Sequence, residues 1–85
     1  MKLKLLFFAA LREQVGVADE SIDLPDGITT VAALRTYLMH RGEAWQRALA
    51  SNRALRVAVN QDMAQGSTPV SSGDEVAFFP PVTGG

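Results

Sequence analysis

The sequence contains no cysteine, only one histidine and only two lysines in 85 residues. A chain without cysteine has no disulfide, no thiolate ligand for a metal and no cysteine nucleophile. Its apolar run near the amino terminus is far shorter than the roughly 20 residues that a membrane span requires. We therefore expect a protein of the cytoplasm that holds no metal and has no membrane partner.

Basic residues are also too few for a nucleic-acid-binding domain. Eight Lys and Arg stand against nine Asp and Glu, which gives a net charge of −1. Nucleic-acid binders typically carry a clustered basic footprint, so we expect no nucleic-acid partner. With 47% hydrophobic and 20% charged residues, the composition is typical of a globular protein, and the length allows one small domain.

Lys2 and Lys4, followed by apolar residues, imitate the start of a secretory signal peptide. The lysines alternate with leucines, however, as they would in a strand, and loss of the segment would remove much of a small core. We therefore interpret this segment as the first of several strands. The predicted strands span residues 2–8, 19–24, 55–60, a short segment around Met63, and 75–79.

The main helix is predicted by the i, i+3, i+7 spacing of Val31, Leu34 and Leu38. A threonine at 29 or 30 is a suitable cap, and Gly42 is a suitable left-handed stop, so this helix spans residues 30–41. A shorter helix is predicted over 43–50, and residues 10–15 form a helical turn or a loop. Turn sequences lie at 25–27 and 71–74.

This order of elements favours an α+β fold. Two strands, a helix and two or more strands fit a mixed sheet of four or five strands packed on one main helix, which is the β-grasp or ubiquitin-like architecture. Residues 1–79 then form a single domain, and residues 80–85 form an extended, flexible tail that ends in two glycines.

The tail is the part of the chain where chemistry is expected. Two successive prolines favour an extended course, six extended residues reach about 20 Å, and glycines pass through channels too narrow for other residues. We predict that Pro80, Pro81, Val82 and Thr83 insert into a partner and that the reacting groups are Gly84 and Gly85. A frayed terminus without function is the alternative.

An apolar patch is predicted on the open face of the sheet, beside the tail. Strand alternation directs one set of side chains toward the helix, namely Leu3, Leu5, Phe7, Val57, Val59, Val76 and Phe78. The other face then carries Leu6, Phe8, Ala58, Ala77 and Phe79, with Arg12 and Met63 at its edge. Such patches commonly mark interfaces. The alternative is that a loop covers Phe8 and Phe79 as a minor core.

Groups for independent catalysis are scarce. His40 is the only histidine and falls near a predicted helix end, where a capping or solvent role is expected. The sequence has no phosphate-binding loop, no convincing Ser-His-Asp set and no cluster with metal-ligand spacing. We do not expect the chain to be an enzyme on its own.

The carboxyl-terminal segment from Gly73 to Gly85, GDEVAFFPPVTGG, resembles the signature of the small subunit of molybdopterin synthase, the sulfur carrier of molybdenum cofactor biosynthesis. Residues 5–13 are similar to the first strand and following turn of that family, and residues 55–61 to its middle strand. The resemblance spans essentially the whole chain.

The resemblance implies a non-catalytic subunit whose terminal carboxylate, at Gly85, is activated by a partner. An adenylating enzyme resembling a ubiquitin-activating enzyme would use ATP to form an acyl adenylate, and sulfur would then replace AMP. The resulting thiocarboxylate would attack a pterin precursor bound in the large subunit. The resemblance also implies a heterotetramer of two small and two large subunits, and no cofactor bound by this chain.

Three alternatives remain open from the sequence. A sulfur carrier for thiamine or another metabolite has the same fold, although Phe78-Phe79-Pro80-Pro81 is a motif that thiamine carriers typically lack. A ubiquitin-like protein modifier would form isopeptide-linked products. A plain interaction module with an inert tail would form neither adenylate nor thiocarboxylate.

Overall fold

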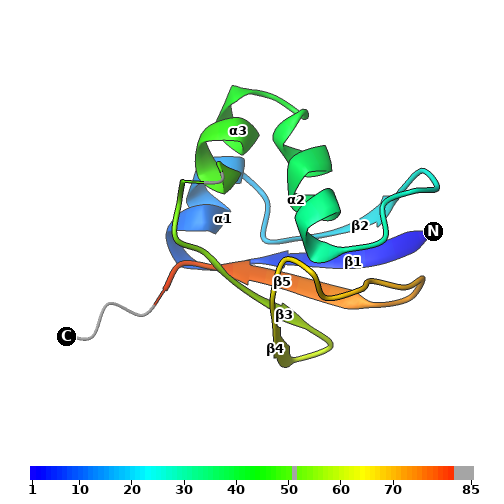
Figure 1. Ribbon diagram of the computed structural model, residues 1–85. Helices are drawn as coiled ribbons and strands as arrows, with labels where there is room; N and C mark the ends of the chain where they lie inside the picture. Colours follow the sequence, from blue (N-terminus) through cyan, green and yellow to red (C-terminus); the bar gives the residue numbers. More distant parts are fainter. Residues whose placement is uncertain (51, 82–85) are drawn as a thin grey trace.

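A five-stranded mixed sheet in the order β2-β1-β5-β3-β4 carries three helices on one face and leaves the other face open (Figure 1). The computed structural model describes residues 1–50 and 52–81. Its elements are β1 (Lys2–Phe7), α1 (Ala9–Val15), β2 (Asp19–Asp23), α2 (Val31–Met39), α3 (Glu43–Leu49), β3 (Arg56–Val59), β4 (Asp62–Ala64) and β5 (Glu75–Phe79). The α+β, β-grasp prediction is confirmed, as are the main helix and the shorter helix after it.

The two central strands come from opposite ends of the chain. β1 pairs antiparallel with β2 and parallel with β5, and β5 pairs antiparallel with β3. Leu5 lies opposite Val76 and Phe7 opposite Phe78 in the β1–β5 register. Both strands end at the same edge of the sheet because they are parallel, and this brings Phe8 beside the start of the tail.

All five predicted strands are present, including the short one around Met63, and their ends differ from the predictions by one residue or less on most strands. The segment predicted as a helical turn or loop is a complete short helix, α1. It ends at Gly16, which has a φ of 82° and donates its N–H to the Arg12 carbonyl at 3.0 Å. A left-handed residue after the last turn is the ordinary way to close a helix.

The main helix begins as predicted but ends differently. The Thr30 side chain accepts a hydrogen bond from the Ala33 N–H at 3.2 Å, which caps α2. The prediction that Gly42 stops this helix is wrong: α2 ends at Met39 with His40 as its capping residue. Gly42 has a φ of 155° and precedes α3, because the chain enters a second helix immediately after the first.

The hydrophobic core lies between the sheet and the helices. It contains six of the seven side chains predicted to face the helix, while the seventh, Val59, is partly buried against it. The helices add buried residues from all three segments, namely Leu11, Val31, Leu34, Leu38, Ala48 and Leu49. The predicted alternation of inward and outward side chains is therefore confirmed for β1, β3 and β5.

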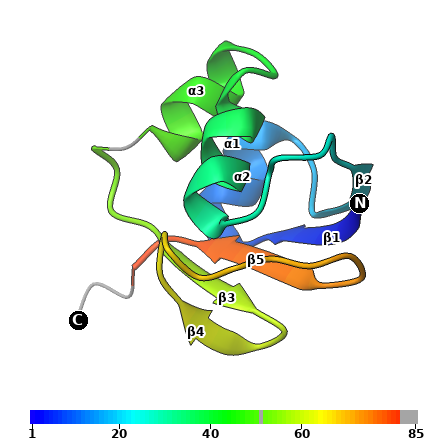
Figure 2. The ribbon, with the colours of Figure 1, turned by 45° about the vertical axis from the view of Figure 1, so that its right-hand side comes forward.

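The chain leaves the sheet at the end of β5 and continues through Pro80 and Pro81. Figures 1 and 2 both place this point at the end of the molecule where α1, α3 and the start of β3 lie. The division into a domain of residues 1–79 and a tail of 80–85 stays a prediction, because Val82, Thr83, Gly84 and Gly85 lie outside the described residues. Within the described ranges, no helix has the length and apolar character to cross a membrane.

Candidate functional site: the open face of the sheet

A row of apolar side chains crosses the open face from β1 to β4. Leu6 is the register partner of Ala77, Ala77 of Ala58, and Ala58 of Met63. Residues that lie opposite each other on paired strands point to the same face, so all four side chains lie on the same side of the sheet. The row ends on Met63, whose side chain is 59% exposed.

A pair of aromatic rings lies next to this row, nearer to the tail. The centroids of Phe8 and Phe79 are 6.5 Å apart and the rings meet edge to face at 80°. Phe8 is 48% exposed, whereas Phe79 is only partly exposed. Aromatic pairs of this geometry are favourable contacts. Phe8 presents its ring to solvent, and Phe79 directly precedes Pro80 and Pro81 in the chain.

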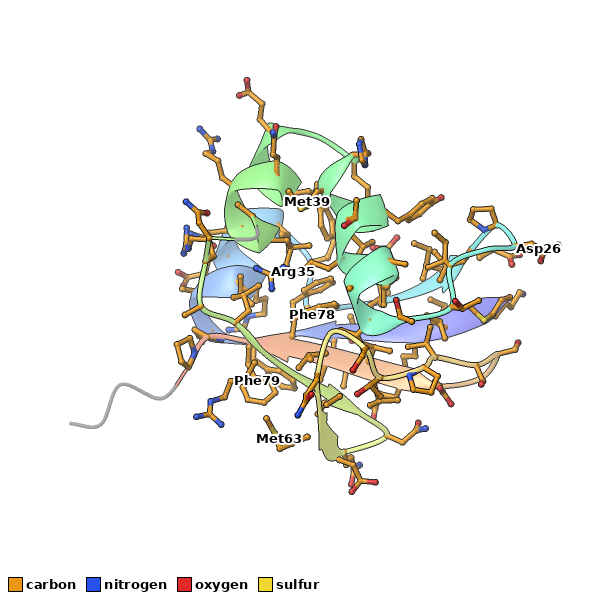
Figure 3. All side chains as sticks on the ribbon, viewed as in Figure 1. Asp26, Arg35, Met39, Met63, Phe78 and Phe79 are labelled. Atoms are coloured by element: carbon orange, nitrogen blue, oxygen red, sulfur yellow. The ribbon has the colours of Figure 1, made fainter. Side chains whose placement is uncertain are left out.

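The open face, defined as Leu6, Phe8, Ala77, Phe79 and Met63, is not covered by any segment that the structure describes. Figure 3 shows Phe79 and Met63 on the side of the sheet opposite to Arg35, Met39 and the helices. The alternative in which a loop covers Phe8 as a minor core does not hold, since Phe8 is about half exposed.

Two expected members of the patch are placed differently from the rest. Ala58 lies in the row but is only 8% exposed, because it has a neighbouring strand on both sides and a side chain too short to pass its larger neighbours. Arg12 is exposed on α1, and Figure 1 places α1 in the helical layer. Arg12 therefore does not lie on the open face but on the other side of the sheet.

The reverse side of the aromatic pair is firmly supported by the core. Phe7 stacks on Phe78 with a centroid distance of 5.8 Å, and Trp45 meets the Phe7 ring edge to face at 5.3 Å. Phe7 is the chain neighbour of Phe8, and Phe78 is the chain neighbour of Phe79. The backbone that carries Phe8 and Phe79 is thus anchored by buried aromatic side chains on the opposite face.

The turn between β1 and α1 contains a strained residue that sequence reasoning missed. Ala9 has a φ of 55°, a left-handed conformation that costs a residue with a Cβ roughly 1–2 kcal/mol. The preceding Phe8 N–H still bonds to the Phe78 carbonyl at 3.2 Å. Phe8 consequently stays aligned with β5 while the chain enters α1 at Ala9, and an alanine offers no sequence signal for this conformation.

A second concave region lies in the helical layer, away from the open face. A cavity of about 280 Å³ is lined mainly by apolar side chains of α2, β3 and β4, with Arg35, Met39 and Phe78 among them (Figure 3). The Arg35 guanidinium donates to the carbonyls of Leu49 at 2.6 Å and Ala50 at 2.5 Å. Burial lowers the pKa of Arg35. Its guanidinium group caps the carboxyl end of α3.

The described residues include no group of metal-ligating side chains beside the patch. Over residues 1–50 and 52–81, no three His, Asp or Glu side chains gather in a way that could hold a metal ion. The lone histidine is exposed and its Nδ1 lies 2.9 Å from the Thr36 carbonyl, which fits the expected capping or solvent role. What the described site offers is therefore an apolar docking face next to a chain end.

The comparison with known proteins decides the family. The ThiS family model matches residues 5–85. The chain belongs to the ThiS family. This ThiS-family chain is 46% identical over 83 residues to the molybdopterin synthase sulfur carrier subunit of Haemophilus influenzae, covering 98% of this chain and 99% of the relative. It is 43% identical to the subunit of the same name from Escherichia coli, with the same coverage.

Solved structures agree with the fold of this ThiS-family chain. Small archaeal modifier protein 1 of Haloferax volcanii matches with a TM-score of 0.74 at 28% identity, over 95% of this chain and 98% of that one. A chain of the complex of subunits 1 and 2 of the molybdopterin-converting factor from Helicobacter pylori matches over both full lengths, with a TM-score of 0.67 at 24% identity. The resemblance drawn from the carboxyl-terminal signature is confirmed by the family match and by the two relatives named above.

Proposed function

We propose that this chain is the sulfur carrier subunit of molybdopterin synthase and carries sulfur as a thiocarboxylate on Gly85. The observation that carries the proposal is the full-length similarity to two subunits of that name, at 46% and 43% identity. The match of the family model through residue 85 supports a role for the chain end. In this proposal the chain works in the cytoplasm, binds no cofactor and is not an enzyme by itself.

The carboxylate of Gly85 is a poor electrophile, so the proposed chemistry begins with its activation. A carboxylate oxygen of Gly85 attacks the α-phosphorus of ATP on a separate adenylating enzyme, and pyrophosphate leaves. A sulfur nucleophile then attacks the acyl carbon of the adenylate and AMP leaves, which produces the thiocarboxylate. Its sulfur attacks an electrophilic carbon of the pterin precursor bound in the large subunit and displaces an oxygen leaving group of that precursor. Water then hydrolyses the resulting thioester, which leaves the sulfur on the pterin and returns the Gly85 carboxylate.

The proposed docking surface is the open face. Aromatic side chains at the centre of an interface often contribute much of the binding energy, and the Phe8–Phe79 pair lies directly before the residues proposed to insert, Pro80, Pro81, Val82 and Thr83. A partner that covers the open face would thereby receive the tail at a defined position. We propose that both the large subunit and the adenylating enzyme bind here, the former in a two-plus-two heterotetramer.

Removal of Gly85 tests the proposal. The shortened chain is expected to unfold at the same temperature as the parent, because the core lies within residues 3–78. Incubated with the adenylating enzyme, ATP and a sulfur donor, the parent is expected to gain the mass of one sulfur in exchange for one oxygen, and the variant is expected to gain none. Molybdopterin formation by the shortened chain with purified partners would refute the proposal.

A second candidate function is a ubiquitin-like modifier, favoured by the similarity to the archaeal modifier protein. Both functions require an activated Gly85, but they differ in what attacks it. A lysine amine of a target protein would produce an isopeptide bond, whereas sulfur produces a thiocarboxylate. Intact-mass spectrometry of the purified chain and a search for isopeptide-linked peptides in the same cells separate the two.

A further inference from the structure

Four of the six arginines in the sequence gather at the end of the molecule where β5 leads into the tail. Arg56 is the register partner of Phe79 and therefore lies on the open face, whereas the other three lie on the helical side of the same end; Arg53 is in the segment before β3. Arg47 is in the last turn of α3, and its carbonyl accepts a hydrogen bond from Arg53 at 3.4 Å. Arg12 lies on α1, which packs against both α3 and β5. We call these four residues the arginine cluster.

The arginine cluster is free to meet a partner. All four residues are exposed, and within the described part of the chain none of their guanidinium groups lies in an ion pair. By contrast, the partly buried Arg35 binds backbone carbonyls and the exposed Arg41 pairs with Glu20. Two members of the cluster, Arg47 and Arg53, line a hollow of about 270 Å³ together with Gln14 and Ala44.

Carboxylates gather at the opposite end. Figure 3 shows Asp26 far from the point where β5 meets the tail, and the sheet register places the turns before β5 and after β3 at that same far end. The carboxylates there are Asp23, Asp26, Asp62, Asp74 and Glu75. Two carboxylates lie nearer to the cluster: Glu13 follows Arg12 on α1, and Asp19 is the register partner of Leu6 near the end of β1. A chain of net charge −1 thus has one markedly positive end.

We propose that the arginine cluster binds carboxylates of the large subunit that flank the mouth of the pocket receiving the tail, with one acidic side chain seated between Arg47 and Arg53. This inference rests on the proposed function and names the chemistry of the partner surface. Separated charges of this kind orient an approaching partner and raise the rate of association. The cluster lies at the base of the tail, so the same attraction aligns the tail with its pocket.

The experiment measures the association rate of the full-length chain with the cognate large subunit by stopped flow, at several salt concentrations. The parent is expected to associate more slowly as salt rises, because exposed charges are screened beyond about 10 Å at 0.1 M salt. The double variant Arg47→Gln with Arg53→Gln is expected to associate about tenfold more slowly at low salt and to lose most of the salt dependence.

Matched variants separate electrostatics from folding. Lys2→Gln with Lys4→Gln removes the same charge at the other end of β1 and is expected to retain the parent rate. Arg47→Lys with Arg53→Lys keeps the charge and is expected to retain most of the rate. Thermal unfolding of every variant verifies that the fold is intact. A lower association rate in the Arg47→Gln, Arg53→Gln variant alone therefore reports on the arginine cluster.

The outcomes distinguish the inference from the proposed function. If the parent binds the large subunit but the rate depends neither on salt nor on Arg47 and Arg53, the inference is wrong and the proposed function stands. If the parent does not bind the large subunit at any salt concentration, both are wrong. The parent could instead bind a mixed-sequence oligonucleotide that the Arg47→Gln, Arg53→Gln variant does not bind, while both bind the large subunit equally. That result would assign the cluster to nucleic acid and overturn the inference.

Discussion

Single residues connect turns that lie far apart in the chain, and Asn60 is the clearest example. Its side chain donates to the Asp74 carboxylate at 3.0 Å and accepts from the Glu75 N–H at 3.0 Å, while its own N–H bonds to the Glu75 carbonyl at 2.8 Å. Asn60 and Gln61 have φ values of 51° and 72°. Asparagine tolerates this left-handed conformation better than most residues, so one side chain both forms the β3–β4 turn and fixes it to β5.

Asn60→Ala is expected to destabilise the fold by about 2 kcal/mol, because two side-chain hydrogen bonds are lost and alanine is less favourable at a positive φ. For a domain of this size, that corresponds to a fall of about 10 °C in the melting temperature. Thermal unfolding followed by circular dichroism measures it.

Gln61→Gly is the control for this prediction. Gln61 is exposed and has the more strained φ of the two, and an Asn-Gly pair is well suited to a two-residue hairpin turn. We expect the melting temperature to stay the same or to rise. An equal loss of stability in Gln61→Gly, which keeps the bonds made by Asn60, would contradict the assignment of the effect to those bonds.

At the scale of elements, two of the three helices have only seven residues and depend on tertiary contacts. Isolated helices of this length are marginal in water. The carboxyl end of α3 is capped by Arg35 of α2, which also donates to the Arg53 carbonyl at 3.0 Å. A guanidinium that binds three carbonyls neutralises the negative end of the helix and holds the following segment in place.

Arg35→Met is expected to destabilise the fold by about 2 kcal/mol, since hydrogen bonds made by a charged donor are lost while the aliphatic stem is retained. Amide hydrogen exchange should accelerate in α3 more than in the central strands. Arg41→Met is the matched control: Arg41 binds Glu20 on the surface, with N–O distances of 2.9 and 2.6 Å. We expect a loss of about 1 kcal/mol or less there, and equal losses would argue against the capping role of Arg35.

At the scale of the whole molecule, one sheet separates a buried face from a face that is free to bind. Phe78 and Phe79 are neighbours in the sequence, yet they point to opposite sides of the sheet. The helical face contributes stability through its buried side chains, and the open face ends at the tail. Substitutions of adjacent phenylalanines should therefore have different consequences.

Phe8→Ala tests this separation. The ring is about half exposed, so we expect unfolding to change by less than about 1 kcal/mol, while binding to the large subunit weakens about 30-fold, equivalent to about 2 kcal/mol. Titration calorimetry with the cognate large subunit measures the affinity. Tyr37→Ala, which alters an aromatic residue of the helical layer, should bind as the parent does, and unchanged binding by Phe8→Ala would contradict an interface on the open face.

Local patterns were sufficient for the order of elements and for the two faces of the sheet. A period of two assigns each side chain of a strand to a face, whatever its neighbours are, so strand alternation alone placed Leu6, Phe8, Ala77 and Phe79 together, with Met63 at their edge. The carboxyl-terminal signature likewise indicated the family, because it consists of contiguous residues.

Other features depend on which distant segments meet, and only the tertiary structure decided them. The parallel pairing of β1 with β5 brings Phe8 beside Phe79, and the packing of α1 against α3 brings Gln14 beside Arg47. The strain at Ala9 and the use of Gly42 before α3 follow from how these elements connect in space. The sequence by itself determined the elements, their faces and the family, since these depend on near neighbours, whereas the charged end of the molecule arises from residues up to 44 positions apart.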